Sequence, residues 1–335
     1  MSNLGVPDLL SNQLFRLRTS NLSRQLASAG RELTTGQRED LSAAAGGDMR
    51  KLYLLETGAA SKAAFSAAAR RAGARAETTL NAIEQVRAST DGLAVDIEAA
   101  TQRGDLATAK RHADTARNAF GASVRALNTR YAGRSLFAGA NVGEAALKPP
   151  EEILDAAFTA VSGAADAADM RNQLRDWFLG AGGGYETDAY NGDASATRMQ
   201  VNDGEYADFD VSALDIPFRR ALFGLALAVG TVEGRLPQAD ADVGDSLSLA
   251  AASLIGAQPG LVDLSADMGG LQEQAVRAET DAETTRTQME MRLNDVVGID
   301  PYEAASRLTG IQGALETALT VQNMTRSLSF VRFIQ

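Results

Sequence analysis

The chain has 335 residues, a formal net charge of −11 at pH 7 and no cysteine. The acidic balance disfavours nucleic acid and anionic membranes as partners, and the absence of cysteine excludes disulfides, zinc–thiolate sites and cysteine nucleophiles. Hydrophobic residues make up 45% of the chain but aromatic residues only 5%. Much of the apolar content is alanine, which favours long, closely packed helices over a thick globular core.

The first predicted helix covers residues 8–33 and carries a narrow apolar stripe. Spacings of three and four residues place leucines along one side of a helix. Gly36 follows as a helix stop, and a linker leads to a helix cap at Asp48. The residues of the stripe form two successive series, Leu10, Leu14 and Leu17 at steps of four and three, then Leu22, Leu26, Ala29 and Leu33 at four, three and four.

Two alanine-rich helices are expected next, from residue 48 to about 103 and from about 105 to 131. Helices with such a short connection are normally antiparallel neighbours. The pattern changes at Gly133, where residues 134–139 are short and turn-like.

A mixed segment occupies the middle of the chain. Two modest helices are predicted at 151–162 and 167–179, with Trp177 and Phe178 filling a small core. Two strands at 197–201 and 207–211 are joined by a hairpin turn at Asp203-Gly204. The apolar helical pattern then resumes from Pro217 to about Glu233, followed by separate helices at about 240–256 and 260–297.

The final helix begins after Gly298 and Pro301 and has its own stripe, which continues almost to the last residue. Since a helix with so narrow an apolar face cannot bury it alone, each end of the chain is the economical partner of the other. Packing within one chain is the simpler alternative, but stripes that run so close to both termini indicate neighbouring copies as well. The second half of this predicted assembly interface is Leu308, Ile311, Leu315, Leu319, Leu328 and Val331.

The predicted fold is therefore mainly α. A long antiparallel helical bundle or coiled coil is formed by both chain ends, with a small mixed α/β insertion domain in the middle. The expected parts are a terminal assembly helix at each end, the two halves of a helical shaft and an outer head. Their predicted boundaries are 1–47, 48–132, 133–235, 236–299 and 300–335.

Residues with catalytic or metal-binding chemistry do not form a recognisable site. His112 is the only histidine and is expected on a helix surface. Residues 180–184 are glycine-rich but lack the Lys-Ser/Thr of a phosphate loop. Asp188, Asn191 and Asp193 lack the spacing of a calcium-binding EF-hand loop. The acidic residues Asp240, Asp242 and Asp245 suit a helix start.

We therefore expect no enzyme activity, no cofactor and no metal. The alternatives are an enzyme housed in residues 133–235 and a coiled-coil signalling protein. The segment 133–235 lacks a set of acid, base or ligand residues, and the chain lacks the membrane span or recognisable input domain of a signalling receptor. The N-terminus has neither the basic nor the apolar region of a cleaved signal peptide. The best apolar run, 221–229, is shorter than the roughly 20 residues of a membrane span, so we expect no membrane insertion.

Residues 33–38, Leu-Thr-Thr-Gly-Gln-Arg, resemble the Leu-Ser/Thr-Thr-Gly-x-Arg signature that follows the first helix of bacterial flagellins and hook-associated proteins. Residues 21–26 before them are similar to the Asn-Leu-x-x-x-Gln-x-Leu pattern of that family, with a small shift. The resemblance covers roughly residues 1–130 and 260–335. It departs after Arg38, where the family's Ser-x-x-Asp-Asp-Ala/Pro-Ala is replaced by residues 41–48.

Two stretches in the middle distinguish members of this family. Residues 131–139 are similar to a Gly-Arg-Tyr-Leu-Phe-Ser-Gly stretch of the hook–filament junction proteins, and residues 190–193 are similar to their Tyr-x-Gly-Asp hairpin region. Flagellin proper usually lacks both. The resemblance therefore favours a junction protein, with flagellin, the filament subunit, as the alternative.

The resemblance implies an extracellular axial protein of the flagellum that is exported unfolded through the type III channel without a cleaved signal peptide. Its implied partners are neighbouring copies of itself, hook-associated protein 1, flagellin and a cytosolic export chaperone. The terminal helices, at 8–33 and 302–331, would fold together when the subunit is incorporated.

Overall fold

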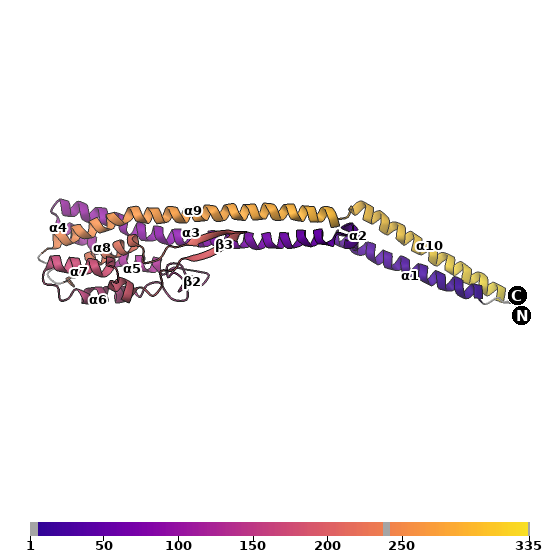
Figure 1. Ribbon diagram of the computed structural model, residues 1–335, viewed down its shortest axis with the longest axis horizontal. Helices are drawn as coiled ribbons and strands as arrows, with labels where there is room; N and C mark the ends of the chain where they lie inside the picture. The colour runs from indigo at the N-terminus through magenta and orange to yellow at the C-terminus, as the bar shows by residue number, and fades with distance from the viewer. Residues whose placement is uncertain (1–5, 237–241, 334–335) are drawn as a thin grey trace. The chain divides into compact units, whose positions relative to one another are not determined.

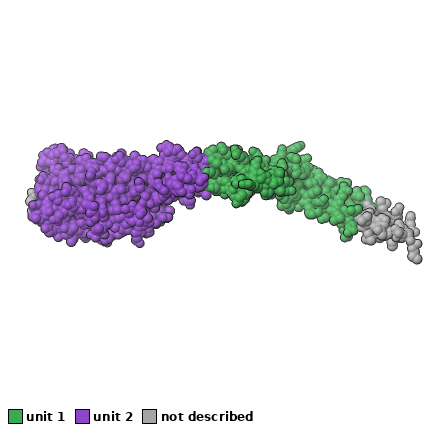
Figure 2. All heavy atoms as spheres, viewed as in Figure 1, with its two compact units in different colours: residues 1–63, 283–335 green, residues 64–282 purple. Residues whose placement is uncertain are grey.

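The computed structural model describes the backbone of residues 6–236 and 242–333, and the side chains of residues 13–236 and 242–324 (Figure 1). The chain forms two compact units. Unit 1 contains residues 1–63 and 283–335, and unit 2 contains residues 64–282 (Figure 2). The predicted mainly α class, with long helices from both chain ends and a small mixed region in the middle, is confirmed.

Unit 1 is built from helices only, within the residues described. Its elements are α1 (Val6–Thr35), α2 (Leu41–Ala44), the first part of α3 (Met49–Gln102), the last part of α9 (Val243–Val297) and α10 (Pro301–Phe333). Gly36 follows α1 with a φ of +71°, the left-handed conformation that glycine adopts without strain at a helix end. The first helix therefore ends just before Gly36, the residue that the sequence predicts as its stop.

Two backbone hydrogen bonds join the segment after α1 to the segment between α9 and α10. The amide of Arg38 donates to the carbonyl oxygen of Val297 at 2.8 Å, and the amide of Ile299 donates to that of Gly36 at 3.1 Å. Between them, Gln37 and Gly298 form an antiparallel bridge. Because the end of α1 is thus fixed beside the start of α10, the two helices run antiparallel.

In unit 2, α3 and α9 lie side by side along a face rich in alanine. A Cβ atom added to Gly73 would lie 3.4 Å from the Cβ of Ala275, so the two backbones approach closely. Polar cross-links follow the same line. Gln258 donates to the Thr90 hydroxyl at 2.9 Å, and the Arg70 guanidinium lies 2.9 Å from the Glu279 carboxylate. The expected close packing of alanine-rich helices is found here.

The helix predicted at about 105–131 is two helices, α4 (Leu106–Ala113) and α5 (Ala116–Leu127). Asp105 caps α4 by accepting a hydrogen bond from the amide of Thr108 at 3.0 Å. The break comes at Asp114 and Thr115. The Thr115 hydroxyl donates to the His112 carbonyl oxygen at 2.8 Å, a local bond of the kind that competes with continuation of the helix.

The rest of unit 2 contains short helices and two hairpins. Its elements are β1 (Arg130–Tyr131), β2 (Arg134–Ser135), α6 (Pro150–Ala160), α7 (Ala167–Leu179), the π-helix η1 (Tyr185–Ala189), β3 (Thr197–Asn202), β4 (Glu205–Phe209) and α8 (Ile216–Val232). Both strand pairs are antiparallel. The hairpin across Asp203-Gly204 was predicted, whereas the β1–β2 hairpin was expected only as a turn.

Helix α8 is the centre of the unit 2 core. Every residue from Ala221 to Thr231 is buried, and the helix packs against α5 and α7. The ring of Phe218 meets that of Phe137 edge-on at 5.7 Å between centroids. A helix that is apolar on all sides is typical of a core position. Trp177 and Phe178, on α7, are also buried here as predicted, at 7% and 0% exposure.

Helix α9 is continuous, so the prediction of separate helices at about 240–256 and 260–297 is wrong. Pro259 lies inside it. Its ring is exposed, while Leu254, Ala257 and Leu261 on the opposite side are 0–1% exposed. Burial of that face outweighs the local cost of a proline, which removes one helix hydrogen bond.

Replacing Pro259 by alanine should therefore stabilise unit 2, by about 1–3 kcal/mol, because it restores the missing hydrogen bond on an exposed face. Urea unfolding followed by circular dichroism measures this change. Pro150 is the matched control, since it occupies the first turn of α6, where proline is preorganised for the helix. Its change to alanine should bring no gain. Equal effects at both positions would contradict this account of α9.

Among the described helices, α9 also has a window of 18 residues with a mean hydropathy of 1.3, of which 33% is buried. By length and composition alone, this window could cross a membrane. Core helices of water-soluble proteins meet the same criterion. The best apolar run that we identified in the sequence, 221–229, lies in α8 and not in this helix.

Candidate assembly surface of the terminal helices

Helices α1 and α10 lie side by side (Figure 1). They pack along a seam of small and aliphatic side chains. Ala29 and Ala304 are the most buried residues on the seam, at 3% and 2% exposure. The other members are half-buried. The seam is formed by Leu22, Leu26, Ala29, Ala304, Leu308, Ile311, Leu315 and Ala318.

The spacing of these residues explains the pairing. Steps of four and three residues on each helix keep one narrow stripe facing the partner, as in a coiled coil. Alanines at Ala29 and Ala304 let the helices approach closely where they leave the joint at Gly36. The seam therefore extends from the joint along both helices, but it leaves most of each helix surface uncovered.

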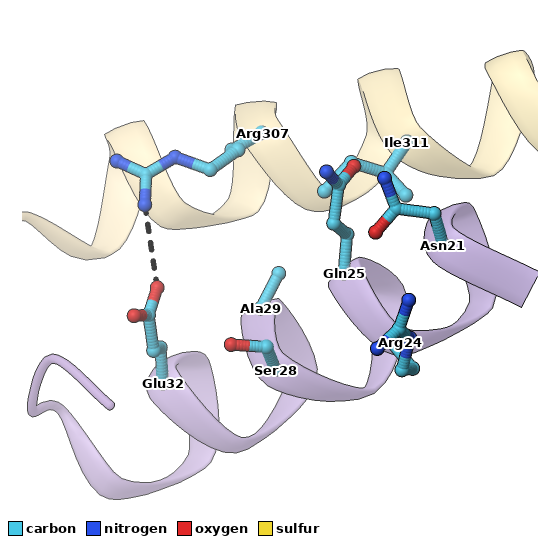
Figure 3. A pocket seen from close by; sticks show the side chains of 8 residues that line it. All are labelled: Asn21, Arg24, Gln25, Ser28, Ala29, Glu32, Arg307 and Ile311. Atoms are coloured by element: carbon cyan, nitrogen blue, oxygen red, sulfur yellow. Dashed lines mark hydrogen bonds and ion pairs between the residues drawn. The ribbon is translucent and has the colours of Figure 1, made fainter. Parts of the chain in front are cut away.

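A polar contact crosses the pair beside the seam (Figure 3). The Arg307 guanidinium lies 3.3 Å from the carboxylate of Glu32, whose side chain is only 13% exposed. The second Glu32 oxygen accepts the amide of Glu39 at 3.0 Å, so this carboxylate also holds the chain after α1. Arg307 lies 3.1 Å from Glu303 on its own helix. These contacts fix the register of α10 against α1.

The same residues border an open groove of about 560 Å³ between the two helices (Figure 3). Its lining is Asn21, Arg24, Gln25, Ser28, Ala29, Glu32, Arg307 and Ile311. Apart from Ala29 and Ile311, which belong to the seam, the lining side chains are amides, one hydroxyl and charged groups. Figure 3 shows Gln25 and Asn21 reaching toward α10 beside Ile311. The groove has the composition of a rim at a helix interface.

Large apolar side chains remain exposed on both helices. Leu14 and Leu17 are 60% and 64% exposed, and Leu319 and Val321 are 46% and 50% exposed. At 100° of rotation per residue, Leu14 and Leu17 lie on a different side of α1 from the seam. Exposed large apolar side chains on both terminal helices are candidates for contact with a neighbouring molecule.

The residues predicted as an assembly interface thus fall into three groups. Leu22, Leu26, Leu308, Ile311 and Leu315 are half-buried in the seam. Leu14, Leu17, Leu33 and Leu319 are exposed. Leu10, Leu328 and Val331 belong to the helices, but their side chains lie outside the described part of the chain.

Sequence reasoning did not single out Ala304 or the Glu32–Arg307 pair. Ala304 could have been found, because it precedes Leu308 by four residues and so continues the stripe. The ion pair could not, since its two residues are 275 positions apart and only the register of the helices brings them together.

The other candidate residues serve the fold. His112 lies on the surface, where its Nδ1 is 3.6 Å from an oxygen of Asp96. Asp193 accepts the amides of Ala140 at 2.7 Å and Ser195 at 3.0 Å, and these bonds lower the pKa of its carboxyl. Asp242 pairs with Arg171 at 2.7 Å, whereas Asp240 lies outside the described residues.

Gly180 and Gly183 contact the backbone of the preceding helix rather than forming a phosphate loop, since a Cβ added at either would meet the Asp176 carbonyl oxygen. Among the described residues, no group of three or more histidine, cysteine, aspartate or glutamate side chains is arranged to hold a metal ion.

No protein-family profile matches the sequence, and no curated protein matches it either. Solved structures that resemble the chain include one from Vibrio parahaemolyticus, a protein provisionally designated flagellar hook-associated. The TM-score is 0.38 and the sequence identity 13%, over 71% of this chain and 95% of that one. With a likeness of this size, function has to be argued from the residues of the chain itself.

Proposed function

We propose that this protein is a structural axial subunit of the bacterial flagellum, and that its mechanism is helix packing rather than catalysis. The observation that carries the proposal is the pair of terminal helices. They share a seam within the chain, yet Leu14 and Leu17 remain 60% and 64% exposed. Neighbouring copies that cover these leucines would be stabilised by about 25 cal/mol for each Å² of apolar surface that is buried.

The subunit's proposed position is the junction between hook and filament, where hook-associated protein 3 acts. There it would bind hook-associated protein 1 on one side and flagellin on the other. The support comes from the two stretches that resemble junction proteins, because they contact each other. The Tyr190 hydroxyl donates to the carbonyl oxygen of Phe137 at 3.3 Å, and the Asp193 amide donates to that of Ala138 at 3.1 Å. Residues 131–139 and 190–193 thus form one local structure.

Export belongs to the same proposal. The chain would pass unfolded through the flagellar type III channel with the help of a cytosolic chaperone, and it would act outside the cell. A chain without cysteine has no disulfide to form or break along that route.

Flagellin is the second candidate function, because the signature at residues 33–38 is common to both. Negative-stain electron microscopy of the purified protein in a salting-out salt separates the two, since such salts strengthen apolar burial. Long regular filaments of this protein alone would identify a filament subunit. Filament growth only after flagellin is added to hooks that carry this protein would identify a junction subunit.

The role of the exposed leucines can be tested directly. We expect Leu14→Gln with Leu17→Gln to weaken association with neighbouring subunits by about 100-fold or more, because burial of a leucine contributes about 1.5–3 kcal/mol. Sedimentation velocity and incorporation into isolated flagella measure this loss. Helix content should stay unchanged, since neither side chain contributes to the seam.

The matched control is Leu106→Gln with Ile216→Gln. These residues of unit 2 are 41% and 49% exposed, so the change removes comparable apolar surface away from the terminal helices. The control should assemble as the unmodified protein does. Full assembly of the Leu14 and Leu17 variant would refute the proposed interface.

A further inference from the structure

Unit 2 contains a cavity of about 240 Å³ lined by four arginines. Arg71 and Arg75 come from α3, Arg134 from β2 and Arg198 from β3. The rest of the wall is Tyr131, Ala132, Ser135, Leu136, Val142, Thr197 and Met199. The cavity is thus formed where the β1–β2 hairpin and the start of β3 meet the long helix.

One of the four arginines is neutralised. The two guanidinium nitrogens of Arg198 lie 2.5 and 3.0 Å from the carboxylate oxygens of Asp208 across the β3–β4 hairpin. Among the described side chains, no carboxylate lies within 4.0 Å of the guanidinium of Arg71, Arg75 or Arg134. Three positive charges therefore share the cavity without an acidic partner, in a chain that has 43 acidic and 32 basic residues.

Arg75 is the most enclosed of the three. Its guanidinium donates to the Thr197 hydroxyl at 2.7 Å and stacks 4.2 Å above the centre of the Phe209 ring. Burial, and secondarily the positive charge of Arg134, lower the pKa of Arg75 to about 10. It is therefore still a cation at neutral pH, held in place by neutral contacts and, among the residues that the structure describes, without a counter-ion.

Ser135 provides an independent observation. It lines the same cavity, the residue is 1% exposed, and its hydroxyl oxygen has no hydrogen-bond partner within the described part of the chain. Buried hydroxyls are nearly always paired, and one without a partner requires an explanation. The two-residue turn before it, with φ of +50° at Ala132 and +78° at Gly133, holds Arg134 and Ser135 in adjacent positions on the wall.

We propose that this cavity binds an oxyanion, a carboxylate or phosphate group, through Arg71, Arg75 and Arg134, and that the Ser135 hydroxyl rotates toward the bound group as a further donor. Guanidinium groups donate paired hydrogen bonds that match the oxygens of both groups. The group is either a free anion from solution or an acidic side chain of a second copy of this chain. The inference stands apart from the proposed flagellar role, because it uses only residues of unit 2.

Isothermal titration with inorganic phosphate at low ionic strength tests the binding. The variant is Arg71→Gln with Arg134→Gln, since both side chains are exposed enough to change without opening the core. Loss of two charge-assisted bonds should weaken binding by about tenfold or more. Arg75 is left intact because it packs on Phe209. Fluorescence of Trp177 confirms that the variant is folded.

Arg70→Gln is the matched control. Arg70 precedes Arg71 on α3, but it is paired with Glu279 and lies outside the cavity lining. The control should bind phosphate as the unmodified protein does. Phosphate that binds equally well to the Arg71 and Arg134 variant overturns the proposal.

Sedimentation velocity distinguishes the two sources of the group. If a second copy supplies a carboxylate, the Arg71 and Arg134 variant associates more weakly, and phosphate competes with association of the unmodified protein. If the group is a free anion, phosphate binds and association is the same in both proteins. Neither phosphate binding nor a change in association would leave the cavity without a ligand and refute the inference.

Discussion

Replacing Arg219 by methionine should destabilise unit 2 by about 3–5 kcal/mol, the range for breaking a buried ionic network by removing one partner. Arg219 lies on α8 and is only 4% exposed. Its guanidinium donates to the carbonyl oxygens of Phe178 at 2.6 Å and Gly180 at 2.9 Å, and to the Glu186 carboxylate at 2.7 Å. Without it, the carbonyl oxygens of Phe178 and Gly180 lose this donor, and the Glu186 carboxylate keeps the bond from the amide of Gly182 at 2.7 Å.

Arg220 is a close control for this prediction. It is the next residue on α8, but it is exposed and makes one hydrogen bond, to the carbonyl oxygen of Gly256 at 2.9 Å. Its change to methionine should cost less than about 1 kcal/mol. Urea unfolding followed by the fluorescence of Trp177, the chain's only tryptophan, reports on this unit alone. Similar losses for the two variants would show that Arg219 is not the link we describe.

Removal of residues 320–335 should abolish incorporation into flagella while leaving a soluble, folded unit 2. The truncation removes the exposed Val321 and Met324 together with the end of α10. It spares the seam from Ala304 to Ala318, so α1 keeps most of its partner within the chain. Since the proposed assembly depends on apolar surface beyond the seam, we expect the truncated chain to show no incorporation at all rather than a reduced amount.

Addition of purified truncated protein to isolated hooks separates assembly from export. Electron microscopy then scores whether flagellin can extend the structure, with the full-length chain as the reference. Unchanged fluorescence of Trp177 shows that unit 2 of the truncated protein is still folded. Normal filament growth on hooks given the truncated chain would count heavily against assembly through the terminal helices.

Local patterns were enough to predict much of the fold. The three- and four-residue spacing identified α1 and α10, and Gly36 marked the end of α1, because these features depend only on neighbours along the chain. The β3–β4 hairpin was predicted for the same reason, from Asp203-Gly204 between two short strand-like runs. The π-helix at residues 185–189 has no such local signature.

Features decided by tertiary packing were not predictable in this way. Pro259 is a helix breaker by its own chemistry, and only the burial of Leu254 and Leu261 on the opposite side keeps α9 continuous. The arginine-lined cavity is assembled from α3 and two hairpins, up to 127 positions apart between Arg71 and Arg198. The exposure of Leu14 and Leu17 likewise depends on which side of α1 the partner helix covers.

The joint at the base of α1 and α10 has a consequence for sequence divergence. It is formed by main-chain atoms, from Arg38 to Val297 and from Ile299 to Gly36, so the hydrogen bonds themselves do not depend on which side chains stand at those positions. Proline is excluded at positions 38 and 299, where an amide must donate, and the φ of +71° favours glycine at position 36. Substitutions at positions 38 and 299 that keep the amide can therefore accumulate while the terminal helices keep their register.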